Sequence, residues 1–163
     1  IIPSYVCQAV LNAVYHAKAT PILADIQDDF SKGYNISAKT IKPLITKKTR
    51  AIILPHTSGY PAEMEEIVTL GIPIIEDCSQ SLGASYKGKK VGSFGIVSTF
   101  SFFSTKMIST GHGGLVATNS KKIKEKLDDL TTYDKRKRFK VAYNYSISDI
   151  QAALGISQLN KSK

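Results

Sequence analysis

Short apolar runs alternate along the chain with longer segments in which apolar residues recur every three or four positions. The short runs are typical of strands buried in a parallel sheet, and the longer segments are typical of amphipathic helices. Their alternation predicts an α/β fold, in which a mostly parallel sheet carries helices on both faces. The predicted strands cover residues 1–3, 21–26, 51–54, 73–77, 97–102 and 114–118.

Residues that favour helix ends support the predicted helices. Ser37, Ser120 and Ser148 each precede an apolar stripe, where a serine hydroxyl can accept a bond from a free N–H of the first turn. Pro61 at a first helical position and Gly71 just past the end bracket another helix. The residues expected to face the core are Val6, Val10, Leu11 and Val14; Ile41, Leu44 and Ile45; Met64, Ile67 and Val68; Ile123, Leu127 and Leu130; and Ile150, Leu154 and Leu159.

Length and apolar content indicate one globular domain. The chain has 163 residues, of which 42% are apolar, so a sizeable core can form and disorder is not indicated. It opens on Ile1 within an apolar run, and we expect it to be a piece of a longer chain. No apolar stretch approaches the roughly 20 residues that cross a bilayer, and no signal peptide is visible.

Two cysteines, Cys7 and Cys78, stand in apolar sequence without metal-ligand spacing. This pattern predicts buried free thiols rather than a disulfide, and no metal site. Free thiols fit a reducing compartment, so we expect a cytoplasmic protein.

The formal net charge of +9 is compatible with nucleic acid, an anionic membrane surface or a phosphorylated small molecule as partner. Much of the excess lies between Lys121 and Lys140. No regular aromatic platform, zinc finger, helix-turn-helix or RNA-binding signature accompanies it. We therefore interpret this region as a solvated helix face followed by a basic loop rather than as a nucleic-acid site. Residues 131–145 lack a clear period and are the predicted mobile loop.

Asp77 ends a predicted strand that is otherwise apolar. Ligands of open α/β sheets bind beyond the carboxyl ends of the strands, and a carboxylate buried there needs a cationic partner. A protonated pyridine nitrogen is such a partner, and the carboxylate keeps that nitrogen protonated so that the ring can accept electrons. Taken alone, Asp77 fits a strand-end cap or an ordinary ion pair equally well.

Lys106 follows the predicted strand 97–102 and precedes a glycine-rich turn, residues 111–114. A lysine in a partly desolvated pocket can lose its proton and attack an aldehyde. Ser101, Ser104 and Thr105 offer hydroxyls for a phosphate, as do backbone N–H groups in a tight turn. Taken alone, Lys106 fits a solvated surface lysine better, and only its combination with Asp77 and these hydroxyls favours a cofactor site.

Several blocks of sequence resemble, in the same order, those of the DegT/DnrJ/EryC1/StrS family of sugar aminotransferases, which depend on pyridoxal phosphate (PLP). The resemblance covers nearly the whole chain. The blocks are residues 3–5 with Asn12 and Ala13; Asp25 and Ile26; His56 with residues 59–64; residues 75–80; Gly88 with residues 91–95; residues 100–106; Gly113 and Gly114; residues 143–145; and residues 150–155.

The resemblance implies a type I PLP-dependent aminotransferase large domain and a homodimer whose active site lies at the subunit interface. By the same resemblance, Lys106 forms the Schiff base with PLP, Asp77 pairs with its pyridine nitrogen and Gln80 lies against the ring or its hydroxyl. Ser101 contacts the cofactor phosphate, and Asn144 reaches the phosphate bound by the neighbouring subunit. His56 is expected to support the pocket rather than react.

Some features differ from the family pattern. A phosphate-binding Gly-Thr segment is expected before Ile1 and a small C-terminal domain after Lys163, so residues 1–163 are predicted to be a partial PLP-binding large domain. Members of the family often carry an aromatic residue near the position of Cys7 and an Arg near that of Ser146.

The function implied by the resemblance is transfer of an amino group, from a donor such as glutamate, to a keto group on a nucleotide-linked sugar. Surface-polysaccharide and antibiotic-sugar pathways require such a step. One alternative is a PLP-dependent dehydratase or amino-aromatic synthase of the same family; sugar dehydratases replace the lysine that Lys106 retains. The other alternative is a catalytically inactive fragment that binds a partner through its basic region.

Overall fold

The computed structural model describes residues 1–134 and 139–162 and confirms the α/β class with a mostly parallel sheet. The strands are β1 (Ile2–Pro3), β2 (Leu23–Ala24), β3 (Ile52–Pro55), β4 (Ile74–Asp77), β5 (Ser85–Tyr86), β6 (Lys89–Lys90), β7 (Val97–Ser101) and β8 (Gly114–Ala117). The α-helices are α1 (Gln8–His16), α2 (Ala38–Ile41), α3 (Met64–Val68), α4 (Lys121–Thr131) and α5 (Asp149–Lys161), and short 3-10 helices are η1 (Phe30–Lys32), η2 (Lys42–Leu44) and η3 (Thr57–Gly59).

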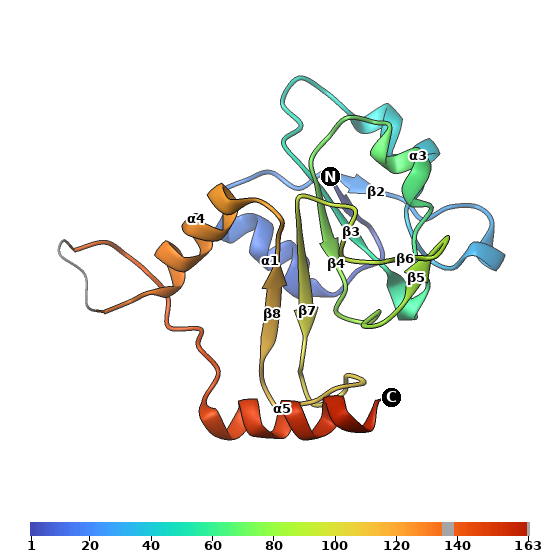
Figure 1. Cartoon of the computed structure of the whole chain (residues 1–163). Helices are drawn as coiled ribbons and strands as arrows, with labels where there is room; N and C mark the ends of the chain where they lie inside the picture. The colour runs from blue at the N-terminus through green and yellow to red at the C-terminus, as the bar shows by residue number, and fades with distance from the viewer. Residues whose placement is uncertain (135–138, 163) are drawn as a thin grey trace.

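The main sheet has the order β3-β4-β7-β8 (Figure 1). Strands β3, β4 and β7 run parallel, and β8 pairs antiparallel with β7. The parallel pair β1-β2 adjoins β3, where the Ile53 N–H donates to the Ile1 carbonyl at 2.9 Å. Because β3, β4 and β7 share one direction, the residues that follow them gather at one edge of the sheet, where ligands bind in open α/β folds.

The buried core lies where α2 and α3 pack on β2, β3 and β4. Its members are Ala24, Ile36, Ile41, Ile52, Leu54, Ala62, Met64, Ile67 and Ile74. In the view of Figure 1, α1 passes behind β7 and β8. Helix α5 runs across the lower ends of β7 and β8 in the same view.

The predicted N-caps are confirmed. Ser37 and Ser148 each form a capping box, and the Ser120 hydroxyl accepts from the Ile123 N–H at 3.3 Å. Each cap satisfies an N–H that the helix itself leaves free, so three short polar residues fix where α2, α4 and α5 begin.

Some predictions of burial and helix position are wrong. Pro61 is not the first residue of α3, which starts at Met64, because the Ala62 N–H bonds to the His56 ring and holds this stretch outside the helix. Val68 is exposed, and so are Leu130 in α4 and three residues of α5 that were expected in the core. These three are Ile150, Leu154 and Leu159, with Ile150 83% exposed. A stripe predicts a helix, but it does not specify what covers the stripe.

Further differences concern a hairpin and a thiol. Strands β5 and β6 form an antiparallel hairpin that the sequence pattern did not predict, turning through Lys87 and Gly88 with positive φ. Both cysteines are free, as predicted, but Cys7 is exposed and only Cys78 is buried. Within the described residues, no helix combines the length and the apolar content that a membrane crossing needs. Residues 135–138, four basic residues of the predicted loop 131–145, lie outside the described part of the chain.

Candidate active site

A cleft of about 530 Å³ lies at the edge where the parallel strands end. The loop from β1 into α1 forms one wall, and the residues after β3, β4 and β7 form the other. Its lining includes His56, Asp77, Gln80, Ser101 and Lys106. The sheet thus brings four of the five predicted site residues, Lys106, Asp77, Gln80 and Ser101, into one cleft.

Lys106 lies on the loop between β7 and β8, residues 102–113, which we call the lysine loop. Its base, where the loop leaves and rejoins the sheet, is closed by two backbone hydrogen bonds of 2.9 Å, from the Phe102 N–H to the Gly113 carbonyl and from the Thr110 N–H to the Phe102 carbonyl. The Lys106 N–H bonds back to the Phe103 carbonyl, also at 2.9 Å. The half-buried lysine therefore lies on a loop whose two ends are joined by backbone hydrogen bonds.

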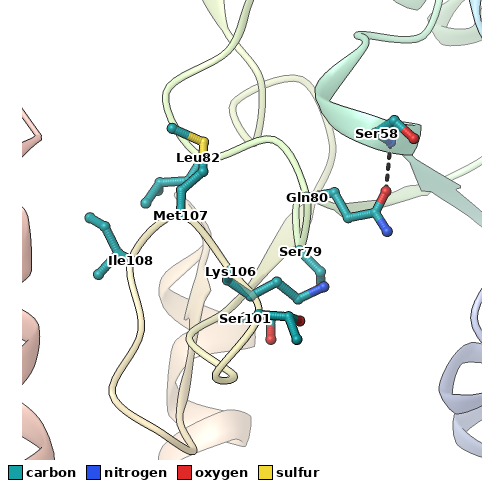
Figure 2. A pocket seen from close by; sticks show the side chains of 9 residues that line it. Ser58, Ser79, Gln80, Leu82, Ser101, Lys106, Met107 and Ile108 are labelled. Atoms are coloured by element: carbon teal, nitrogen blue, oxygen red, sulfur yellow. Dashed lines mark hydrogen bonds between the residues drawn. The ribbon is translucent and has the colours of Figure 1, made fainter.

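A second cavity of about 330 Å³ adjoins the cleft and shares Lys106 with it. Figure 2 shows the Lys106 side chain extending toward Ser79 and Ser101, while Met107 and Ile108 lie on the other side of this cavity. The amine thus faces hydroxyl and amide groups rather than the apolar wall.

The side chains of Asp77, Gln80 and Ser101 are each held by a hydrogen bond from a backbone N–H. Asp77 accepts from the Ser79 N–H through Oδ1 at 3.0 Å. Gln80 accepts from the Ser58 N–H through Oε1 at 2.6 Å, the bond drawn in Figure 2. The Ser101 hydroxyl accepts from the Phe103 N–H at 3.3 Å. A carboxylate, an amide and a hydroxyl are therefore presented to the same space as the amine.

Asn144 is the one predicted site residue that does not join this group. It is exposed, between α4 and α5, and it lines neither cavity beside Lys106. Of the two positions that differ from the family pattern, Cys7 lines the cleft, whereas Ser146 lines a separate hollow along β8. Cys7 is therefore positioned to touch a ligand in the cleft of its own chain.

The feature that the sequence reasoning missed is a buried pair behind the cleft, His56 and Glu76, both with fully buried side chains. His56 Nδ1 accepts from the Ala62 N–H at 3.1 Å, so the ring proton lies on Nε2, which donates to Glu76 Oε2 at 3.1 Å. Both ring nitrogens of His56 are thus used within the protein, and its supporting role stays a prediction.

The Glu76 carboxylate also accepts three backbone bonds from the loop after β6. Gly92 donates to Oε2 at 2.7 Å, and Phe94 and Gly95 donate to Oε1 at 2.7 and 2.6 Å. Burial raises the pKa of Glu76, but the bonds from His56 and from these N–H groups outweigh it and hold the pKa below its ordinary value of 4.5. Glu76 is therefore an anion that fixes this loop against β4.

His56, Glu76 and Cys78 bring three ligand-type atoms within 4.8 Å of one another. Both ring nitrogens of His56 are engaged in hydrogen bonds. Burial, followed by the charge of Glu76, raises the pKa of the Cys78 thiol to about 12, which opposes the thiolate that a metal ion binds. We interpret the group as a hydrogen-bonded support of the cleft.

The fold is shared with solved aminotransferases. Among solved structures, PseC of Helicobacter pylori, an aminotransferase involved in the biosynthesis of pseudoaminic acid, matches with a TM-score of 0.88 and 31% identity, over 98% of this chain and 45% of that chain.

The chain belongs to the DegT/DnrJ/EryC1/StrS aminotransferase family, whose model matches residues 1–163. GDP-perosamine synthase of Escherichia coli O157:H7 is 38% identical over 99% of this chain and 46% of that protein. A putative pyridoxal phosphate-dependent aminotransferase of Bacillus subtilis, EpsN, is 33% identical over 96% of this chain and 43% of that protein. The chain thus spans less than half the length of the curated relatives it matches.

Proposed function

We propose that this chain contributes the cofactor-binding part of an aminotransferase that moves an amino group from a donor such as glutamate to a keto group on a nucleotide-linked sugar. The observation that carries the proposal is that Lys106 and Asp77 line one cleft at the carboxyl ends of β4 and β7. Membership of the family and the names of its relatives, such as GDP-perosamine synthase, support the substrate class.

The residues present fit pyridoxal phosphate. An amine can hold the aldehyde through a Schiff base, and a carboxylate can pair with the ring nitrogen. Lys106 and Asp77 supply these two groups, while Gln80 and Ser101 supply polar partners for the ring and the phosphate. The bound cofactor supplies an electron sink for the carbon that exchanges its amino group.

In this proposal each side chain has a separate task. Asp77, fixed by the Ser79 N–H, keeps the ring nitrogen protonated. Lys106 would hold the cofactor, and its free amine would carry a proton between the substrate carbon and the cofactor carbon through the Nζ atom. The half-buried position of Lys106 limits competing contact with water.

A second copy of the chain would complete the site in this proposal. Asn144 is exposed and lies away from the cleft of its own chain, which leaves it available to reach the cofactor phosphate held by a partner. A homodimer with two composite sites follows.

The test is borohydride reduction of the full chain after incubation with PLP, followed by peptide mapping. One adduct at Lys106 is expected, with no adduct in Lys106→Ala. Lys126→Ala, on the exposed side of α4, is the matched control and should load as the wild type does. An adduct that persists in Lys106→Ala at the wild-type level contradicts the assignment.

Product analysis then separates the chemistries. Wild-type protein with glutamate and a GDP- or UDP-linked ketosugar is expected to yield the aminosugar, and Lys106→Ala to yield none. A dehydrated sugar without nitrogen as the product would instead favour the dehydratase alternative. If RNA or DNA binds with steeply salt-dependent affinity and PLP does not bind, the binding-module alternative is favoured.

A further inference from the structure

The turn at Thr57–Gly59, which borders the cleft, is clamped from outside by one buried amide. Asn35 is 1% exposed and lies on the segment between η1 and α2. Its Oδ1 accepts from the Thr57 N–H at 2.9 Å, and its Nδ2 donates to the Tyr60 carbonyl at 2.8 Å. Because the two partners are of opposite kind, they fix which end of the amide is oxygen and which is nitrogen. Asn35 thus ties both sides of the turn to a distant segment.

Inside this clamp, Ser58 adopts a left-handed conformation with φ of 56°. Such a backbone is uncommon for a residue with a Cβ and persists where the surroundings hold it. It directs the Ser58 N–H at Gln80 Oε1, 2.6 Å away. The turn also rests on the backbone of Gln80, since a Cβ added at Gly59 would lie 3.2 Å from the Gln80 carbonyl oxygen. The turn and Gln80 therefore form one packed unit.

This bond decides what Gln80 offers to a ligand. With Oε1 occupied by the Ser58 N–H, the Nε2 end of the amide is the one directed away from the turn, as Figure 2 shows. Gln80 lines both cavities beside Lys106. An amide nitrogen donates and does not accept, so Gln80 presents N–H donors to the space where a ligand binds.

We propose that Asn35 is a positioning residue of the active site: through the Thr57–Gly59 turn and the Ser58 N–H it sets the Gln80 amide so that Nε2 donates to an acceptor oxygen of the ligand. The proposal rests on the proposed function for the identity of that ligand, PLP. Asn35 itself touches neither cavity. Its influence on the cofactor must therefore pass through Gln80.

A double-mutant cycle on the full chain tests this. Asn35→Ala, Gln80→Ala and the double variant are loaded with PLP, and two quantities are measured: the Kd for PLP and the pH midpoint of the absorbance change of the bound cofactor. Gln80→Ala should weaken PLP binding by about fivefold, the loss of one ordinary hydrogen bond. Asn35→Ala should shift the pH midpoint in the same direction as Gln80→Ala, and the double variant should match Gln80→Ala alone.

Controls separate positioning from general destabilisation. Asn160→Ala, the same change on the exposed part of α5, should leave both quantities at wild-type values. If Asn35→Ala does not fold, Asn35→Asp keeps the shape and the Thr57 bond but removes the donor to Tyr60, and the same midpoint shift is expected.

Two outcomes overturn this proposal without touching the proposed function. One is a wild-type pH midpoint in folded Asn35→Ala or Asn35→Asp. The other is a double variant in which the effects of the Asn35 and Gln80 substitutions on PLP Kd and pH midpoint are fully additive. Failure of the wild-type chain to bind PLP at Lys106 overturns the proposed function as well, so the two failures are distinct.

Discussion

Replacing Glu76 by Gln should destabilise the protein severely, although the two side chains have nearly the same shape. The carboxylate accepts four hydrogen bonds, two on each oxygen, and its side chain is fully buried. A Gln can keep its oxygen toward Phe94 and Gly95, but its NH₂ group then faces two other donors, the Gly92 N–H and His56 Nε2–H. His56 cannot switch its proton to Nδ1 without losing the bond from Ala62.

The loss of stability in Glu76→Gln follows from the number of buried donors that are left without an acceptor. Each buried donor left without a partner costs about 1–3 kcal/mol, so two of them cost about 2–6 kcal/mol. Against a typical domain stability of about 5–15 kcal/mol, this is a large fraction. Urea unfolding at neutral pH, followed by circular dichroism, gives the free energy of unfolding of the wild type and of Glu76→Gln.

Glu65→Gln is the matched control, because Glu65 makes a 2.5 Å ion pair with Lys87 in which both side chains are more than 60% exposed. An exposed pair of this kind is screened by water and contributes little to stability. If Glu76→Gln lowers the free energy of unfolding by no more than Glu65→Gln does, the assignment of Glu76 as a buried structural anion is wrong.

Two further predictions concern titration and thiol chemistry. The hydrogen-bond partners of Glu76 hold its pKa below 4.5, so its contribution to stability should be complete above pH 4.5 and lost as the pH falls below that value. Urea midpoints measured from pH 3 to 7 should therefore decline on the acid side. The Glu76→Gln variant should show a smaller decline. Cys7 is exposed and lines the cleft, so it should react rapidly with a disulfide reagent and be protected when PLP is bound. Cys78 is buried and its pKa is raised to about 12, so it should react only on unfolding. Two rapidly reacting thiols in the native protein would contradict this prediction.

The strands and helix starts could be predicted from the sequence because each depends on local information. A run such as residues 51–54 is apolar on both faces, and a cap such as Ser37 bonds to an N–H three residues away. The cleft could be predicted in part for the same reason, since Asp77 and Ser101 end parallel strands that share an edge. Parallel pairing then brings them together without any further signal.

The remaining features depend on contacts between distant residues. Glu76 and His56 are 20 positions apart, and nothing in either local pattern shows that a hydrogen bond joins them. The clamp on the Thr57–Gly59 turn joins Asn35 to residues more than 20 positions later. The exposure of Ile150 reflects the absence of a covering surface among the described residues, a property that helical period does not encode.

The base of the lysine loop is closed by backbone hydrogen bonds. Mutations at the tip of the loop can therefore change the cleft without changing the sheet. The two bonds of 2.9 Å from the Phe102 N–H to the Gly113 carbonyl and from the Thr110 N–H to the Phe102 carbonyl join backbone atoms, so they do not depend on the side chains at the tip of the loop. Substitutions at Met107, which is 75% exposed, can therefore remodel the wall beside Lys106 without disturbing the register of β7 and β8. If the proposed function holds, such a scaffold can acquire new acceptor preferences one residue at a time while the backbone that carries Lys106 stays in place.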